Sequence, residues 1–177
     1  MSSVTPVTPE PPVAPVTHPV PDAAAYLTGR WSVERTLGDL ATGADGTFRG
    51  TAEFRPAAGD GELLHIEDGV LTWNGTTNRA GRTLRLRPRP DGTADVAFAD
   101  GRPFHPLDLR TGHWTTRHPC AQDRYDGTFT VVSPDEWHLS WRTTGPAKDQ
   151  LHRSVYRRLR GPAGAPLEGS NGQGVSM

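Results

Sequence analysis

The sequence contains one cysteine, Cys120, and one lysine, Lys148. The other eighteen of its nineteen basic residues are arginines. A single cysteine cannot form a disulfide within the chain. Long hydrophobic runs are also missing, which excludes a membrane-spanning segment, and residues 1–21 lack the basic and apolar regions of a secretory signal. We therefore expect a cytoplasmic protein with no membrane partner.

Neither sign of charge dominates the chain. Nineteen basic and twenty acidic residues give a formal net charge of −1. This balance does not supply the broad basic surface that nucleic-acid-binding proteins use. The glycine patterns of dinucleotide-binding and phosphate-binding loops are missing as well. We therefore expect no nucleic-acid partner and no cofactor.

Both ends of the chain are poor in large apolar residues. Residues 1–21 repeat proline, valine and threonine, and residues 161–177 are rich in glycine, proline and serine. We predict that both ends are disordered and that a single domain spans 22–160. Asp22 is placed to cap a short helical turn over 23–27, just before the first strand.

Between the ends, apolar residues recur with a period of two, and turn signals occur about every ten residues. The clearest strand is 136–143, where Trp137, Leu139 and Trp141 share one face. Further strands are predicted over 30–37, 47–55, 62–67, 70–73, 84–87, 94–98, 103–109, 113–117, 125–132 and 151–159. The pattern predicts an all-β fold.

About eight to ten short antiparallel strands favour a single up-and-down barrel, because closure removes exposed sheet edges. A closed sandwich is the alternative. A barrel of this size is wide enough to hold one small ligand. Gly50 and Ala52 fall on the inner face of 47–55, and their small side chains leave space inside.

Motifs near the two ends of the predicted domain resemble those of the calycins, the group of lipocalin and fatty-acid-binding barrels. They are Gly29-Arg30-Trp31, and Tyr156 and Arg157 on the last strand. The resemblance implies that Trp31 closes one end of the barrel and that the Arg157 guanidinium packs across it.

A wider set of motifs is similar to an uncharacterised bacterial and fungal family, the domain-of-unknown-function family numbered 6314. The motifs are Tyr26-Leu27-Thr28-Gly29-Arg30-Trp31, Arg102-Pro103-Phe104-His105, Leu107-Asp108, His118-Pro119-Cys120, Asp123-Arg124-Tyr125, Trp141 and Gly145-Pro146-Ala147-Lys148-Asp149. This similarity covers about 24–158. It implies a calycin-like barrel and no particular activity.

Arg35 is the anomaly of the first predicted strand, because period two places it on the inner face with Trp31. A lone charge inside a barrel is costly unless a carboxylate or a ligand compensates it. Two explanations are open. Either Arg35 is compensated by an internal acid such as Asp108 or Glu67, or by water near the rim, or it anchors the acidic group of a ligand.

His118, Cys120 and Asp123 form a polar cluster around Pro119. The spacing His-x-Cys-x-x-Asp lacks the paired ligands typical of metal sites, so we expect no metal. A nucleophile–base pair of Cys120 and His118 would need an oxyanion hole that no motif encodes. The simpler interpretation is that Cys120 is a small buried residue and that its neighbours bond to the backbone.

Lys148 follows the turn at Gly145-Pro146. It is either a rim residue neutralised by Asp149 or Asp123, or an amine placed over the barrel mouth beside Tyr125. In the second case it would bind an acidic ligand or donate a proton.

Three hypotheses of function follow. The leading one is a barrel, monomeric or homodimeric, that binds a small acidic aromatic or lipidic ligand in its interior. The first alternative is a cofactor-free enzyme of the cyclase, isomerase or hydratase type, with His118 or Asp123 as base and Lys148 or Tyr125 as acid. The second is a non-enzymatic protein interaction module. The predicted ligand contacts are Arg35, His105, His118, Asp123, Tyr125, Trp141 and Lys148.

Overall fold

The computed structural model describes residues 16–59 and 61–161. Within them, one short helix, α1 (Ala23–Leu27), precedes ten strands that form a single antiparallel sheet. The strands are β1 (Gly29–Asp39), β2 (Asp45–Pro56), β3 (Leu63–Trp73), β4 (Thr76–Pro88), β5 (Ala94–Phe98), β6 (Pro103–Leu107), β7 (His113–Cys120), β8 (Asp123–Ser133), β9 (Glu136–Gly145) and β10 (Lys148–Arg158). The all-β, up-and-down architecture is confirmed.

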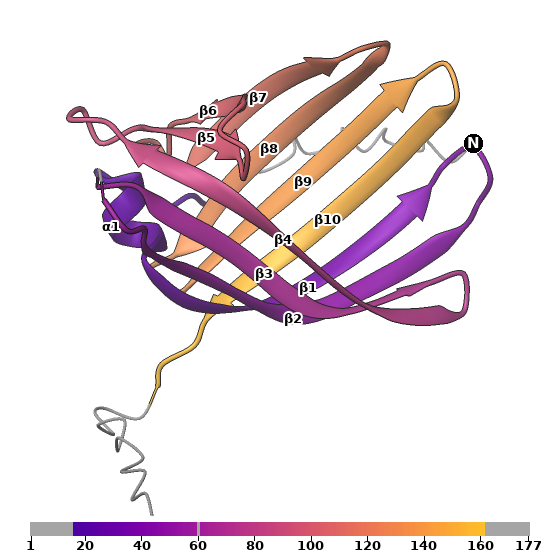
Figure 1. Cartoon of the computed structure of the whole chain (residues 1–177), viewed down its shortest axis with the longest axis horizontal. Helices are drawn as coiled ribbons and strands as arrows, with labels where there is room; N and C mark the ends of the chain where they lie inside the picture. Colours follow the sequence, from indigo (N-terminus) through magenta and orange to yellow (C-terminus); the bar gives the residue numbers. More distant parts are fainter. Residues whose placement is uncertain (1–15, 60, 162–177) are drawn as a thin grey trace, which may run out of the picture.

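The sheet curls into a nearly closed barrel (Figure 1). Its strand order is β6-β5-β4-β3-β2-β1-β10-β9-β8-β7, so β6 and β7 are the two edges. β6 contains Pro103 and Pro106, which have no N–H group to donate to a ladder. In the described part of the chain, these edges are joined by a side chain instead, because Trp114 Nε1 donates to the carbonyl oxygen of Pro106 at 3.0 Å. We call this junction the seam.

The two ends of the barrel differ (Figure 1). α1 lies at one end, which we call the capped end, and the turns of the β1–β2, β3–β4, β7–β8 and β9–β10 hairpins form the other, which we call the open end. β5 and β6 are short strands, and β5 pairs only with the Leu84–Pro88 part of β4. The wall is therefore incomplete toward the open end.

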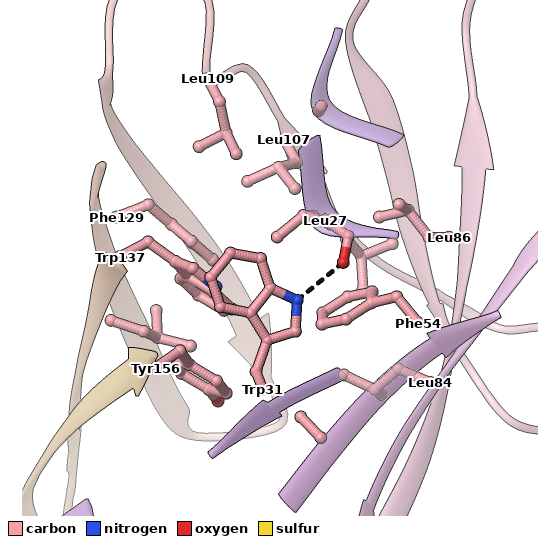
Figure 2. Close-up of a cluster of buried hydrophobic side chains, with 14 of the residues drawn as sticks. Leu27, Trp31, Phe54, Leu84, Leu86, Leu107, Leu109, Phe129, Trp137 and Tyr156 are labelled. Atoms are coloured by element: carbon pink, nitrogen blue, oxygen red, sulfur yellow. Dashed lines mark hydrogen bonds between the residues drawn. The ribbon is translucent and has the colours of Figure 1, made fainter. Parts of the chain in front are cut away.

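Trp31 is the centre of the capped end (Figure 2). Its side chain is completely buried, and its Nε1 donates to the carbonyl oxygen of Leu27 at 2.8 Å. The guanidinium carbon of Arg158 lies 4.1 Å from the centre of a Trp31 ring. The resemblance to calycins implied Arg157 here, which is wrong: Arg157 faces outward and its Nε donates to Glu136 at 3.0 Å. Arg158 shares the inward face with Tyr156, as period two requires.

The small residues of β2 do not leave the space expected inside the barrel. Gly50 lies opposite Gly69 of β3. A Cβ atom on Gly69 would lie 2.7 Å from the Gly50 Cα and 2.8 Å from Cζ of Phe48. The Phe48 ring therefore fills this region. The pairing of β3 with β2 is continuous through Gly69, so the strands predicted over 62–67 and 70–73 are one strand, β3.

Asp22 caps α1 as predicted, because its Oδ1 accepts a hydrogen bond from the Ala25 N–H at 3.0 Å. Part of the segment predicted as a disordered arm is packed on the barrel. His18 N donates to Val131 O at 2.8 Å, and the Val20 side chain is 3% exposed. The rest of the predicted arm, 1–15, and nearly all of the tail, 162–177, lie outside the described residues, so their disorder stays a prediction. No helix in the described ranges is long and apolar enough to cross a membrane.

Candidate functional site

A groove of about 650 Å³ lies at the seam, toward the open end. We call it the seam groove. It runs between the turn of the β5–β6 hairpin and the end of the β7–β8 hairpin. Its lining residues are Phe98, Arg102, Pro103, Phe104, His118, Pro119, Cys120 and Tyr125. A groove of this volume is within the range of small-molecule sites.

Phe104 is the centre of the aromatic residues at the groove. Its ring stacks on Phe98, with centroids 4.7 Å apart, and on Trp141, with centroids 5.2 Å apart. The edge of the His118 ring contacts it at a centroid distance of 5.1 Å. Tyr125 lies opposite His118 in the β7–β8 ladder and completes this wall. Partly exposed aromatic rings thus form a wall of the groove, against which a planar ligand can pack.

A second space, of about 40 Å³, lies behind Phe104 inside the barrel. We call it the inner cavity. Phe104 lines both this cavity and the seam groove, so its ring separates the two. Most of the cavity wall is apolar, with contributions from Leu107, Leu109 and Phe129. The volume is enough for a small group but not for a whole aromatic ligand.

Glu67 organises the polar part of the barrel interior, and its side chain is 1% exposed. The Arg35 Nη2 donates to both Glu67 oxygens at 2.9 and 3.0 Å, and the Arg82 Nε donates to Oε2 at 2.9 Å. The Tyr156 hydroxyl donates to Oε1 at 2.6 Å. Burial alone would raise the pKa of Glu67, but His65 and the two guanidiniums outweigh it and hold the pKa far below its usual range.

This network shows what compensates the charge of Arg35 inside the barrel. Its partner is Glu67, and Asp108 is instead paired with Arg110 at 2.7 Å. Arg82, the second arginine of this network, was not predicted as an inward residue, because the predicted strand began only at Leu84. If the alternation of inward and outward side chains is continued from Leu84 toward the N-terminus, Arg82 falls on the inner face. Two guanidiniums now face one carboxylate, which leaves one positive charge in excess.

Lys148 and Asp123 form an ion pair at the rim, with 2.6 Å between Nζ and Oδ2. The hydrogen bond to Asp123 raises the pKa of Lys148 above its usual value. The Lys148 side chain is 46% exposed, and Asp149 pairs with Arg142 at 2.6 Å. The first of the two interpretations of Lys148, a neutralised rim residue, fits this geometry. A lysine with a raised pKa is a poor proton donor, so this ion pair does not favour Lys148 as the acid of the enzyme hypothesis.

His105 is buried beside Trp141, with ring centroids 5.4 Å apart. Its Nδ1 lies 2.8 Å from the carbonyl oxygen of Pro106. Burial lowers the pKa of His105 to about 4, with smaller contributions in the same direction from His118 and Arg82, against the opposing hydrogen bond to Pro106. His105 is therefore neutral at pH 7.

Cys120 is exposed, which corrects the expectation of a buried residue. It lies on the wall of the seam groove with His118, while Asp123 turns to Lys148. In the part of the chain that the structure describes, no group of three His, Cys, Asp or Glu side chains is arranged to hold a metal ion. Of the seven predicted contacts, His118 and Tyr125 line the seam groove, Trp141 and His105 lie behind Phe104, and Arg35, Lys148 and Asp123 are held in ion pairs.

Residues 27–158 match the "Family of unknown function (DUF6314)". The chain belongs to this family. Comparison of this chain with curated proteins gives no match.

Similarity to one solved structure, with a TM-score above 0.5, supports the barrel fold of this DUF6314 protein. The S-type phycobiliprotein lyase CPES from Guillardia theta is 10% identical, with a TM-score of 0.59 over 78% of this chain and 92% of that chain. The structure of EF1p2_mFAP2b bound to DFHBI is 15% identical, with a TM-score of 0.43 over 77% and 97% of the two chains. At these identities the similarity concerns the fold alone.

Proposed function

We propose that this barrel binds a small aromatic molecule with an acidic group, and that the ligand's ring lies in the seam groove. The observation that carries the proposal is the stack of Phe98, Phe104 and Trp141 beside a groove of about 650 Å³. Elsewhere in the described barrel, aromatic rings such as Trp31 and Tyr156 are completely buried. The rings of the seam groove are partly exposed, and exposed aromatic surface in a concave site is a feature of ligand pockets.

The charge of the site favours an anionic ligand. The network of Arg35, Arg82 and Glu67 leaves a positive charge in the barrel, where a low dielectric extends its field. At the rim, Arg102 lies over the Phe98 ring, with its guanidinium carbon 5.3 Å from the ring centre. The Arg102 Nε donates to Asp100 at 2.7 Å. The Arg102 side chain is 75% exposed, which leaves its terminal nitrogens open to solvent.

The proposed contact for the ligand's acidic group is therefore Arg102 and not Arg35, which the sequence suggested. Arg35 is occupied by Glu67, whereas Arg102 lines the seam groove itself. A guanidinium that already stacks on an aromatic ring can bind a carboxylate or sulfonate with its remaining N–H groups. His118 and Tyr125 keep their proposed role as groove contacts. The cytoplasmic location and the monomeric or dimeric state stay predictions.

The experiment compares two fluorescent probes that differ in charge. One is the anion 8-anilinonaphthalene-1-sulfonate, and the other is the neutral N-phenyl-1-naphthylamine, which has the same ring system. We expect the wild-type protein to bind both and to prefer the sulfonate. The variant Arg102→Gln should lose that preference, and Phe104→Ser should weaken both probes.

Arg79→Gln is the matched control, because Arg79 is also an exposed arginine paired with a nearby carboxylate, Asp68, at 2.7 Å. It lies away from the seam groove on the outer face of β4. An equal loss of preference in Arg79→Gln and Arg102→Gln would show a general charge effect and contradict the site. Absence of binding by the wild-type protein would contradict the function.

A further inference from the structure

The inner cavity contains a hydrogen-bond acceptor that the fold itself does not use. His105 Nδ1 lies 2.8 Å from the carbonyl oxygen of Pro106. A carbonyl oxygen can only accept, so Nδ1 carries the ring proton. Because the pKa of His105 is lowered to about 4, the ring is neutral and Nε2 has a free lone pair. Among the described residues, no donor is hydrogen-bonded to this nitrogen.

The surroundings of His105 restrict what that lone pair can bind. The ring packs against Phe104, Trp141 and Phe129, at centroid distances of 4.8, 5.4 and 5.4 Å. The side chain is 7% exposed, and it lines the inner cavity of about 40 Å³. Among the described residues, His105 Nε2 is not one of the side-chain atoms that are both buried and without a partner, so it is open to a group that enters the cavity. The site therefore suits a small neutral donor.

We propose that the inner cavity is a subsite for a hydroxyl group of the ligand, and that His105 Nε2 accepts its hydrogen. The inference rests on the proposed function, with the ligand's ring in the seam groove and its acidic group at Arg102. The hydroxyl, at the opposite end of the ring, enters past Phe104. The preferred ligand class is then a hydroxylated aromatic acid.

Other groups fit the cavity less well. A carboxylate could accept from the unpartnered Trp137 Nε1, but it offers only lone pairs to His105 Nε2, so these two groups would repel each other. Both cations at this wall are occupied, because Arg82 donates to Glu67 through Nε and Nη2 at 2.9 and 3.2 Å and Arg85 donates to Glu62 at 3.1 Å. A second aromatic ring exceeds the volume of about 40 Å³. A methyl group fits by size but leaves Nε2 without a donor.

The test uses two sulfonates that differ by one hydroxyl, naphthalene-2-sulfonate and 6-hydroxynaphthalene-2-sulfonate. Their hydroxyl and sulfonate groups lie at opposite ends of the ring system. Calorimetric titration of the wild-type protein should show about tenfold tighter binding of the hydroxylated compound, as expected for one net hydrogen bond. The variant His105→Leu should bind the two compounds equally.

His113→Leu is the control, because His113 is an exposed imidazole at the start of β7 that does not line the groove or the cavity. It should keep the tenfold ratio. The ratio within one variant separates recognition from folding, since a general loss of structure weakens both compounds. In wild-type protein with ¹⁵N-labelled histidine, the His105 Nε2 resonance should move with the hydroxylated compound only, which gives a readout without any substitution.

The outcomes separate the two claims. If both sulfonates bind the wild-type protein with equal affinity, or if His105→Leu keeps the preference, the hydroxyl subsite is wrong and the groove remains. If neither sulfonate binds the wild-type protein, the proposed function fails and the subsite fails with it.

Discussion

The capped end and the open end of this barrel use aromatic residues in opposite ways. At the capped end, Trp31 has a fixed hydrogen bond to Leu27 O, and Arg158 covers its ring. At the open end, Phe104 is only partly buried and stacks on Phe98 and Trp141, and the groove beside it has a volume of about 650 Å³. The first arrangement stabilises the fold, and the second leaves aromatic surface for a ligand. The following predictions test that division.

The largest loss of stability is expected at the capped end. Trp31→Ala removes a completely buried indole that contacts Trp137 and Tyr26, with ring centroids 6.2 and 5.5 Å away. We expect the free energy of unfolding to fall by about 4 kcal/mol, because the cavity cannot collapse around so large a side chain. Urea denaturation measures this loss. A loss below about 1 kcal/mol would show that the capped end does not hold the barrel together.

Glu67→Gln should have the next largest effect. It leaves Arg35 and Arg82 in the interior without a carboxylate, and removing one partner of a buried ion pair costs about 3 kcal/mol. The pKa of Glu67 is lowered by folding, so its contribution is present above the unfolded pKa of about 4 and is lost as the pH falls further. Denaturation of both proteins from pH 7 to pH 3 checks this. The difference between them should shrink below pH 4, and a constant difference would contradict it.

His105 should make stability depend on pH in a higher range. Its pKa is about 4 when folded and about 6.5 when unfolded, so the unfolded chain takes up the proton first. Stability is therefore full above pH 6.5 and falls as the pH drops toward 4, by about 2–3 kcal/mol. His105→Leu should flatten this part of the curve, whereas Glu67→Gln should not. An unchanged slope in His105→Leu would mean that the imidazole is accessible to protons in the folded state.

Phe104→Ala should affect the open end with little loss of stability. The side chain is only half-buried, so we expect a loss of about 1–2 kcal/mol, well below that of Trp31→Ala. It also removes the partition between the seam groove and the inner cavity. A loss of stability as large as that of Trp31→Ala, measured by the same urea denaturation, would show that Phe104 is a core residue and that the two ends do not differ.

Lys148→Arg should have the smallest effect. The pair with Asp123 is exposed and can form equally well with a guanidinium, and exposed pairs contribute little. We expect no measurable change in the urea midpoint or in the affinity for 8-anilinonaphthalene-1-sulfonate. A clear loss of affinity with unchanged stability would restore Lys148 as a ligand contact.

Much of the barrel could be predicted from the alternation of apolar residues. Trp137, Leu139 and Trp141 are buried on one face of β9 as the pattern requires. The same alternation, applied without interruption, also points to Arg158 and Arg82. The resemblance to calycins implied Arg157 in place of Arg158, and the strand predicted over 84–87 began too late to include Arg82. Period two could thus have found both residues.

The site itself depends on contacts that no local pattern encodes. Phe104 belongs to β6 and Trp141 to β9, and they meet only because the sheet curls until its edges are adjacent. The protonated nitrogen of His105 is set by the carbonyl oxygen of Pro106, which depends on the backbone conformation of β6. Glu67 was one of two possible partners for Arg35, and only the register of β1, β2 and β3 decides between them.

The most direct test of the division between the two ends is NMR titration of the labelled protein with naphthalene-2-sulfonate. We predict that the largest shifts occur at Phe98, Phe104, His118 and Tyr125, and that the Trp31 indole resonance stays in place. Shifts concentrated at Trp31 and Arg158, or spread over the outer face of the sheet with the groove unchanged, would contradict the account.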